Sequence, residues 1–535
     1  MNKIFEHLIS KRGLNDEFLH PQYEKLTDAF LLPDMEKAIE RIKAAISRRE
    51  KVLIYGDYDV DGVTSSTLME QALKMAGIKE VEIMLPDRFA DGYGMSPKLV
   101  KRAEEQGIGL VITVDCGSAN KEIVQDLQGK NIDVIITDHH ECTRELPDAV
   151  AVVNPKRQDC DLMDVHDLAG VGVAFKFAQG LVKVGLIPDG QEKWLLDLVL
   201  ICTICDNMPL VRENRILCYF GLKVLAKSRR AGLVELFKCA GVSKFNSETI
   251  GFQIGPRLNA AGRIESADLA LNLLRAKSSA EAAALASKLE QLNLQRKSEQ
   301  NEAMAEIEKR GVSAEPVIIE AGDWHEGILG IVAGRLVDKY RRPAFVLSKV
   351  GEGIMKGSGR SFGDFSLAEA LAACGGTIIN GGGHAGAAGV KIETGKVSDF
   401  CEQINAYYKS LKLQEQEKYF YQAEDLSVEE LGDINLELID DLAQLEPFGE
   451  GNAEPILLLS DVEIMEVRVM GHDGKHLCLM VQGKDRKILK LVGFSVPQQW
   501  FLNAPGDHVN ILIQICENEW NHIRSVEGRI INIYA

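Results

Sequence analysis

Three aspartates alternate along the segment GDYDVDG (56–62), and the carboxylates of Asp57, Asp59 and Asp61 would repel one another at neutral pH. Such a group is stable when a cation lies among the oxygens, or when the segment is a solvated turn. Other residues that could bind the same cation decide between these two interpretations.

Further candidate ligands follow other apolar runs of the chain. Asp115 lies in VDCG, His139 and His140 lie in TDHHE, and Asp206 lies in ICDN. Each is a weak signal alone, because an aspartate after a strand is usually a helix N-cap and a DHH triplet can be a solvated loop. Their meaning depends on whether the fold brings them together.

Short apolar runs must position these side chains, namely VLIY (52–55), VEIML (81–85), LVITV (110–114), DVIIT (133–137) and AVAVV (149–153). Each run is nearly continuous in apolar character, as expected for strands covered on both faces. Spacings of roughly 20–30 residues favour βαβ units and a parallel sheet. The C-terminal ends of such strands meet at one edge, so we expect the acids and imidazoles to converge there.

The expected cluster combines many carboxylates with one or two imidazoles, a ligand set that suits Mn²⁺ or Mg²⁺. So many acids favour two ions about 3.5–4 Å apart. Zinc fits less well, because no cysteine is placed to help. Pairs of hard metal ions commonly serve phosphoryl transfer, so the sequence predicts a site for phosphate chemistry.

Candidate phosphate-binding residues are Arg88, Arg257, Arg263, Ser358 and Arg360, of which Arg263 and Arg360 lie beside glycine and small residues. Arginine suits bidentate phosphate contacts, although a surface ion pair is the ordinary role of any one arginine. The segment GGGHAGAAG (381–389) is expected to be a tight turn into a helix, with N–H groups that could bind an anion. His384 within it either contacts a phosphate or packs in the turn.

Two other motifs are given structural interpretations. Gly170 and Gly172 form a lone G-x-G, which lacks the preceding strand and acidic partner of a dinucleotide site and is interpreted as helix packing. Cys202 and Cys205 form a C-x-x-C without a second pair, in an apolar run, and are interpreted as buried free thiols.

The remaining chain predicts an α/β multidomain protein. Residues 160–310 are mostly helical in character, with one long helix over 279–310, and a second α/β unit follows near Pro316. From Pro455 the pattern becomes β only, which favours a small antiparallel barrel of about 90 residues. The aromatic residues that could stack on bases in it are few: Phe448, Phe494, Trp500 and Trp520.

Charge does not settle the partner. The 535 residues carry a net charge of −18, but residues 415–463 hold fifteen Asp and Glu against one Lys, so a local basic groove is compatible with the rest. No apolar run is long enough for a signal peptide or a membrane span, so we expect a cytoplasmic protein without membrane contact.

Taken together, the motifs GDYDVDG, VDCG, TDHHE and Asp206 resemble the DHH phosphoesterase superfamily, and GGGHAGAAG resembles its DHHA1 domain. The segments GFQIGPRLNAAGR, WHEGILGIVAGRL, GSGRS and LEPFGEGNAEP are similar to those of the RecJ family of single-strand-specific DNA exonucleases. The resemblance implies six parts: an N-terminal leader (1–48), a DHH domain (49–215), a helical connector (216–311), a DHHA1 domain (312–411), an acidic linker (412–444) and an OB-fold (445–535).

The resemblance also implies a 5′→3′ exonuclease that releases mononucleotides from single-stranded DNA by two-metal hydrolysis, in DNA repair and recombination. The implied metal ligands are Asp57, Asp59, Asp61, Asp115, His139 and Asp206, with Asp57 less secure. His140, together with Asp115 and His139, would act in catalysis. Arg88, Ser358 and Arg360 would hold the 5′-terminal phosphate, and Arg257, Asn259, Arg263 and His384 would line the DNA path.

Rival interpretations stay open from the sequence. A DHH-type phosphodiesterase of short oligonucleotides or cyclic dinucleotides would share the metal ligands, but such relatives lack the barrel. A non-catalytic DNA-binding scaffold and a metal-stabilised structural protein are the others. We expect a monomer whose further partners would be a helicase or a single-strand-binding protein.

Overall fold

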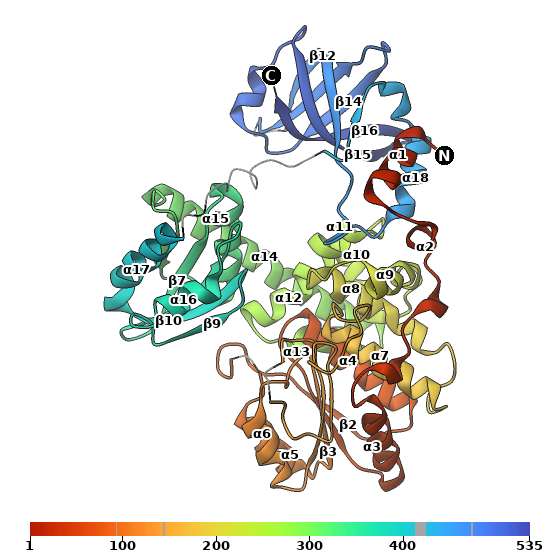
Figure 1. Cartoon of the computed structure of the whole chain (residues 1–535), viewed down its shortest axis with the longest axis vertical. Coiled ribbons are helices and arrows are strands. Elements are labelled where there is room, and N and C mark those ends of the chain that lie inside the picture. The colour runs from red at the N-terminus through yellow and green to blue at the C-terminus, as the bar shows by residue number, and fades with distance from the viewer. Residues whose placement is uncertain (93, 143–144, 412, 414–423, 472–473, 535) are drawn as a thin grey trace.

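The computed structural model describes residues 1–92, 94–142, 145–411, 413, 424–471 and 474–534, with the side chain of Trp520 excepted. Figure 1 shows two α/β units, a barrel and a helical region between them, with a long helix leading to the second α/β unit. None of the helices within these ranges is long and apolar enough to cross a lipid bilayer.

The first α/β unit contains the five parallel strands that the sequence predicts, in the order β2-β1-β3-β4-β5. Their bounds are β1 Val52–Tyr55, β2 Val81–Met84, β3 Leu110–Val114, β4 Asp133–Thr137 and β5 Ala151–Val153. The central strands β1 and β3 are buried along their whole length, because helices cover both faces of the sheet. Those helices are α3 Met35–Arg48, α4 Val60–Met75, α5 Pro97–Gln106, α6 Lys121–Gln128 and α7 Gly170–Lys183.

The region between the two α/β units is helical, which confirms the prediction. Its helices are α8 Leu196–Cys205, α9 Arg212–Leu225, α10 Ala231–Ala240, α11 Ser247–Thr249, α12 Gly255–Ile264, α13 Asp268–Arg275 and α14 Ser279–Arg310. The predicted long helix is α14, which Ser278 caps by accepting a hydrogen bond from the Glu281 N–H. Its buried positions include Ala282, Ala286 and Leu289, at the spacing of one helix face.

The second α/β unit has a mixed sheet in the order β6-β7-β8-β10-β9. Its strands are β6 Ile318–Gly322, β7 Ala344–Gly351, β8 Ile354–Arg360, β9 Asn380–Gly383 and β10 Ala387–Glu393, with helices α15 Leu329–Tyr340, α16 Leu367–Ala373 and α17 Val397–Ser410. The prediction of a turn into a helix at 381–389 is wrong. The segment is an antiparallel hairpin, in which β9 pairs with β10 and β10 extends the sheet from β8.

The barrel is built from strands β12 Leu457–Met470, β13 His476–Gln482, β14 Ile488–Gly493, β15 His508–Trp520 and β16 Ile523–Tyr534. Pairing between β12 and β15 closes it, while β14 and β16 run parallel. Strand β11 (Leu426–Val428) pairs with β12, and helix α18 (Leu436–Leu442) contributes Leu438 to the barrel core. The structure thus places 425–444 with the barrel, whereas the sequence predicts a linker there; residues 412 and 414–423 of that linker lie outside the described ranges.

Two buried contacts attach the barrel to the rest of the chain, alongside backbone contacts and surface ion pairs such as Lys244–Glu517. Helix α1 (Lys3–Arg12) packs its Phe5 and Leu8 into the barrel core, so the predicted leader is part of that domain's packing before helix α2 (Asp16–Leu19) leads away (Figure 1). In the second contact, the buried Arg215 donates hydrogen bonds to the carbonyl oxygens of Gln444, Leu445 and Glu446 at 2.7–2.9 Å, ahead of β12.

The same loop touches the turn that follows Asp206. The Leu210 N–H donates to the Glu450 carbonyl at 2.7 Å, and a Cβ on Gly449 or Gly451 would come within 3.2 Å of Leu210 or Val211. Glycine is therefore required at 449 for this close approach.

Candidate metal centre

The predicted acids and imidazoles converge at the C-terminal edge of the first sheet. Three sets each have ligand atoms within 4.8 Å of one another: Asp57, Asp59 and Asp115; Asp61, His139 and Asp206; Asp115, His139 and His140. All seven side chains that the sequence brings to this edge therefore form one continuous cluster. The strand order accounts for six of them, because β1, β3 and β4 are neighbours in the sheet, while Asp206 comes from α8.

Distances around His139 define the middle of the cluster. Its Nε2 lies 3.1 Å from Asp115 Oδ1, 3.6 Å from Asp61 Oδ2 and 3.9 Å from Asp206 Oδ2. Burial lowers the pKa of His139, which favours the neutral imidazole that a metal ligand must be. Asp206 reaches the cluster from the C-terminal end of α8, where it is the residue after the last helical turn.

The pKa values of four of the acids are raised. Burial, followed by the charge of Asp59, raises the pKa of Asp57 to about 8, and burial with Asp61 raises the pKa of Asp206 to about 8. Burial and the neighbouring carboxylates raise the pKa of Asp115 and Asp59 as well. A group of buried acids can ionise together only with positive charge among them, so the residues fit divalent cations.

Unpaired oxygens support the same assignment. Among the described residues, no protein group forms a hydrogen bond with Asp57 Oδ1, Asp115 Oδ1 or Asp206 Oδ2, although all three atoms are buried. Buried polar atoms are rarely left without a partner, so these oxygens are suited to bind metal ions.

Backbone groups hold Asp61 in place. Gly170 and Val171, the first residues of α7, donate to its two oxygens at 2.6 and 2.8 Å. The positive end of the helix stabilises this carboxylate. A Cβ on Gly170 would lie 2.7 Å from the Asp115 Cβ, so only glycine permits the approach. The sequence interpretation of Gly170 as plain helix packing missed this role; its small size next to an apolar helix was the available signal.

Asp138 orients the histidine pair and was also missed as a site residue. Its Oδ1 accepts from the N–H groups of His139 and His140 and lies 2.8 Å from His140 Nδ1, while Oδ2 accepts from the Ser118 N–H. Although burial alone would lower the pKa of His140, the hydrogen bond to Asp138 raises it. The aspartate that opens the DHH triplet therefore fixes the orientation of the last histidine and raises its pKa.

An arginine group lies beside the acids. The Arg88 guanidinium lies 5.0 Å from the ring centroid of Tyr58, the residue between Asp57 and Asp59 in the chain. Arg263 lies close enough to Arg88, Arg360 and Asp59 to interact with their charges. Burial, followed by the charge of Arg88, lowers the pKa of Arg263 to about 9. Like-charged guanidiniums this close favour a bound anion such as phosphate.

Both α/β units contribute to this arginine group. Arg360 and Ser358 come from β8, where Arg360 Nη1 donates to Ser358 Oγ at 3.2 Å. Gly327 packs so tightly on the Arg263 carbonyl that a Cβ would lie 1.8 Å away, and a Cβ on Gly330 would meet Arg360 and Ser358 within 3.0 Å. Gly327 thus allows the second α/β unit to pack on α12 beside Arg263, and Gly330 allows α15 to pack on β8 beside Arg360.

Arg296 of α14 is a member that the sequence did not predict. It is buried, and it donates hydrogen bonds to the amide oxygens of Asn293 and Gln300. It also lies within electrostatic range of Arg263. Its position at helical spacing from Asn293 was the only available signal, and it is a weak one.

Three other residues that the sequence predicts to bind substrate contact neighbouring protein groups in the structure. Arg257 is buried against Glu290 at 2.5 Å, and Asn259 accepts from the Val60 N–H at 3.0 Å, so both fasten α12 to its neighbours. His384 lies on the exposed hairpin, where its Nδ1 accepts from the Gly386 N–H. In the part of the chain that the structure describes, no contact joins His384 to the arginine group.

Three family models match this chain. The model described as "DHH family, N-terminal domain" matches residues 51–203, that of the "DHHA1 domain" matches 314–410, and that of the "RecJ OB domain" matches 425–532. The three matches coincide with the first sheet, the mixed sheet and the barrel.

Known proteins match over nearly the whole chain. Single-stranded-DNA-specific exonuclease RecJ of Bacillus subtilis is 39% identical, covering 96% of this chain, which spans 66% of that relative's length. The protein of the same name from Haemophilus influenzae is 32% identical over 92% of this chain and 89% of its own. The crystal structure of RecJ from Thermus thermophilus with Mn²⁺ matches at a TM-score of 0.85, with 27% identity, over 100% of this chain and 76% of that one; a second structure of that protein holds Mg²⁺.

Proposed function

The chain belongs to the RecJ family of metal-dependent exonucleases specific for single-stranded DNA, and on this premise we propose that it hydrolyses single strands from the 5′ end to mononucleotides in DNA repair and recombination. The observation that carries the proposal is the contact between two opposite charge clusters. A buried acidic cluster suited to divalent cations adjoins an arginine group suited to phosphate.

We assign two Mn²⁺ or Mg²⁺ ions to Asp57, Asp59, Asp61, Asp115, His139 and Asp206. When bound, such ions would polarise the phosphodiester and lower the pKa of a water nucleophile. The chain's own groups do the remaining work. Gly170 and Val171 keep Asp61 oriented, and Asp138 orients His140, which would donate a hydrogen bond to the scissile phosphate.

Polarity follows from where the terminal phosphate binds. Arg88, Arg263, Arg360 and Ser358 would hold a 5′-phosphate beside the acids, so the first phosphodiester of the strand would lie at the cluster. Selectivity for single strands would arise from a passage between the two α/β units that admits one strand and not a duplex. The exposed Phe494 of the barrel is available for base stacking, whereas Trp500 is in the barrel core.

The test compares strands of about 50 nucleotides labelled at either end with a blunt duplex of the same sequence. We expect a 5′ label to be released at once as a mononucleotide and a 3′ label to persist in shortening products, with Mn²⁺ or Mg²⁺ required. Release of the 3′ label first, or equal digestion of the duplex, would contradict the proposal. Activity confined to strands of two to five nucleotides would instead favour the short-oligonucleotide phosphodiesterase.

A further inference from the structure

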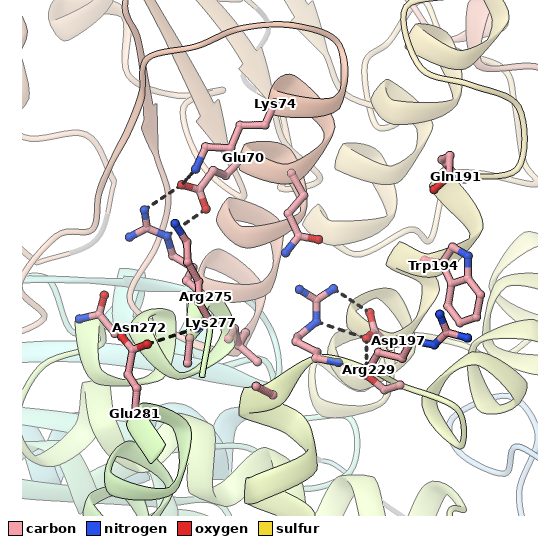
Figure 2. A pocket seen from close by; sticks show the side chains of 16 residues that line it. Glu70, Lys74, Gln191, Trp194, Asp197, Arg229, Asn272, Arg275, Lys277 and Glu281 are labelled. Carbon is pink, nitrogen blue, oxygen red and sulfur yellow. Dashed lines mark hydrogen bonds and ion pairs between the residues drawn. The ribbon is translucent and has the colours of Figure 1, made fainter. Parts of the chain in front are cut away.

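A cavity lies away from the acidic cluster. Its volume is about 880 Å³, within the usual range for ligand sites, and it opens between the C-terminal end of α4, the start of α8, the loop before α10 and the junction of α13 with α14 (Figure 2). Helix α4 carries Asp61 at one end and Lys74 at the other, roughly 20 Å apart at the rise of an α-helix. The cavity is therefore separate from the acidic cluster.

Two arginines face this cavity in fixed orientations. Arg275 donates through Nε and Nη2 to the two oxygens of Glu70 at 2.9 and 2.7 Å. Arg230 donates through the same two atoms to Asp197 at 3.2 Å. Both carboxylate side chains are only 4% exposed, so each guanidinium is held by a buried acid. Among the described residues the Nη1 atoms of both arginines have no protein partner, and these N–H groups are available to an anion.

The cavity also offers an aromatic face and further cations. Trp194 is 45% exposed, and the Arg229 guanidinium lies over its ring at 5.4 Å. Within the described ranges, neither Arg229 nor Lys277 forms an ion pair. Including Lys74, five cations and three acids line the cavity, a local excess of positive charge in a chain whose net charge is −18.

We propose that this cavity binds a nucleotide, with the base stacked on Trp194 and the phosphates held by Arg229, Arg230, Arg275 and Lys277. The exposed indole of Trp194 is a candidate stacking surface, since base–aromatic stacking needs no particular base. The amides of Gln71, Gln191 and Asn272 also line the cavity and can meet polar atoms of a base. This site is distinct from the nuclease centre and does not depend on the proposed function.

The test measures fluorescence anisotropy of ADP carrying a ribose-linked fluorophore, on the full chain in EDTA, so that the acidic cluster holds no metal. We expect saturable binding that Trp194→Ala and Arg229→Glu each weaken at least tenfold. Both side chains are exposed, so neither substitution is expected to unfold the protein. Lys79→Glu, an exposed cation outside the cavity, should stay within twofold, as should Asp115→Asn.

Competition experiments distinguish a site for free nucleotides from a site for nucleotides within a DNA strand. Displacement by unlabelled ADP but not by an oligo(dT) strand assigns the site to free nucleotides, and displacement by both extends it to nucleotides of a bound strand. The proposal is overturned if no saturable binding occurs, if Trp194→Ala and Arg229→Glu leave the affinity unchanged, or if inorganic phosphate competes as well as ADP does.

Discussion

The acidic cluster and the arginine group are neighbours of opposite charge that are built in different ways. Every acid comes from the first α/β unit or from α8, and backbone N–H groups of α7 hold Asp61 directly. The arginines instead come from both α/β units and from α12 and α14, with close packing of Gly327 on Arg263 and of Gly330 on Arg360. The comparison teaches that the acidic cluster is a property of one packed core, whereas the arginine group depends on how separate parts of the chain meet.

The strongest test of this contrast is Asp115→Asn. The substitution keeps the shape of the side chain but removes one charge from the middle of the cluster, so kcat on single-stranded DNA should fall on the order of 10³-fold or more for any strand end. Calorimetric titration with Mn²⁺ should show weaker binding in parallel. Asp126→Asn, at an exposed position of α6, is the matched control. A variant that kept a tenth of wild-type turnover would argue against Asp115 as a ligand.

The stability of the metal-free protein should depend on pH through the acidic cluster and not through the arginine group. The folded-state pKa values of Asp57 and Asp206 are raised to about 8, so between about pH 4 and pH 8 the folded state binds more protons than the unfolded state. Stability should therefore fall as the pH rises through this window, by about 1.4 kcal/mol per pH unit for each extra proton.

Thermal unfolding in EDTA, measured across that window, checks this expectation. Mn²⁺ should restore stability most at pH 8, because the cations replace the protons. Asp206→Asn should show a shallower decline than the wild type. An identical decline in both proteins would mean that the acidic cluster is not its source.

The smallest effect is expected from Arg360→Ala, which alters the arginine group alone. Losing one charged hydrogen-bond donor should raise KM for a 5′-phosphorylated strand about 10- to 100-fold, with kcat and Mn²⁺ affinity nearly unchanged. Arg335→Ala, in the same α/β unit and bonded to Asn301, is the control. If KM rose equally for strands that end in a 5′-hydroxyl, Arg360 would not recognise the terminal phosphate.

The acidic cluster could be predicted from sequence because a short stretch of the chain is enough to place each of its residues. Each strand is a continuous apolar run, each ligand follows such a run, and a parallel sheet brings the run ends to one edge. Asp61 and His139 are therefore placed by rules that need no knowledge of distant contacts.

The arginines were harder to predict because their roles depend on partners far along the chain. Arg257 and Arg263 lie six positions apart on one helix, yet Glu290 neutralises the first while the second lies among other arginines. No pattern within 251–263 distinguishes the two. The hairpin at 380–393 was also mispredicted, because a run of glycines gives no periodic signal for strands.

The attachment of the barrel has a mechanical consequence. The Glu450 carbonyl accepts the Leu210 N–H four residues after Asp206, and Arg215, on the next helix, binds three carbonyls ahead of the first long barrel strand. Tension on a DNA strand bound by the barrel would thus be transmitted through this loop to the turn that follows Asp206. We expect the rate of hydrolysis to respond to load on the strand.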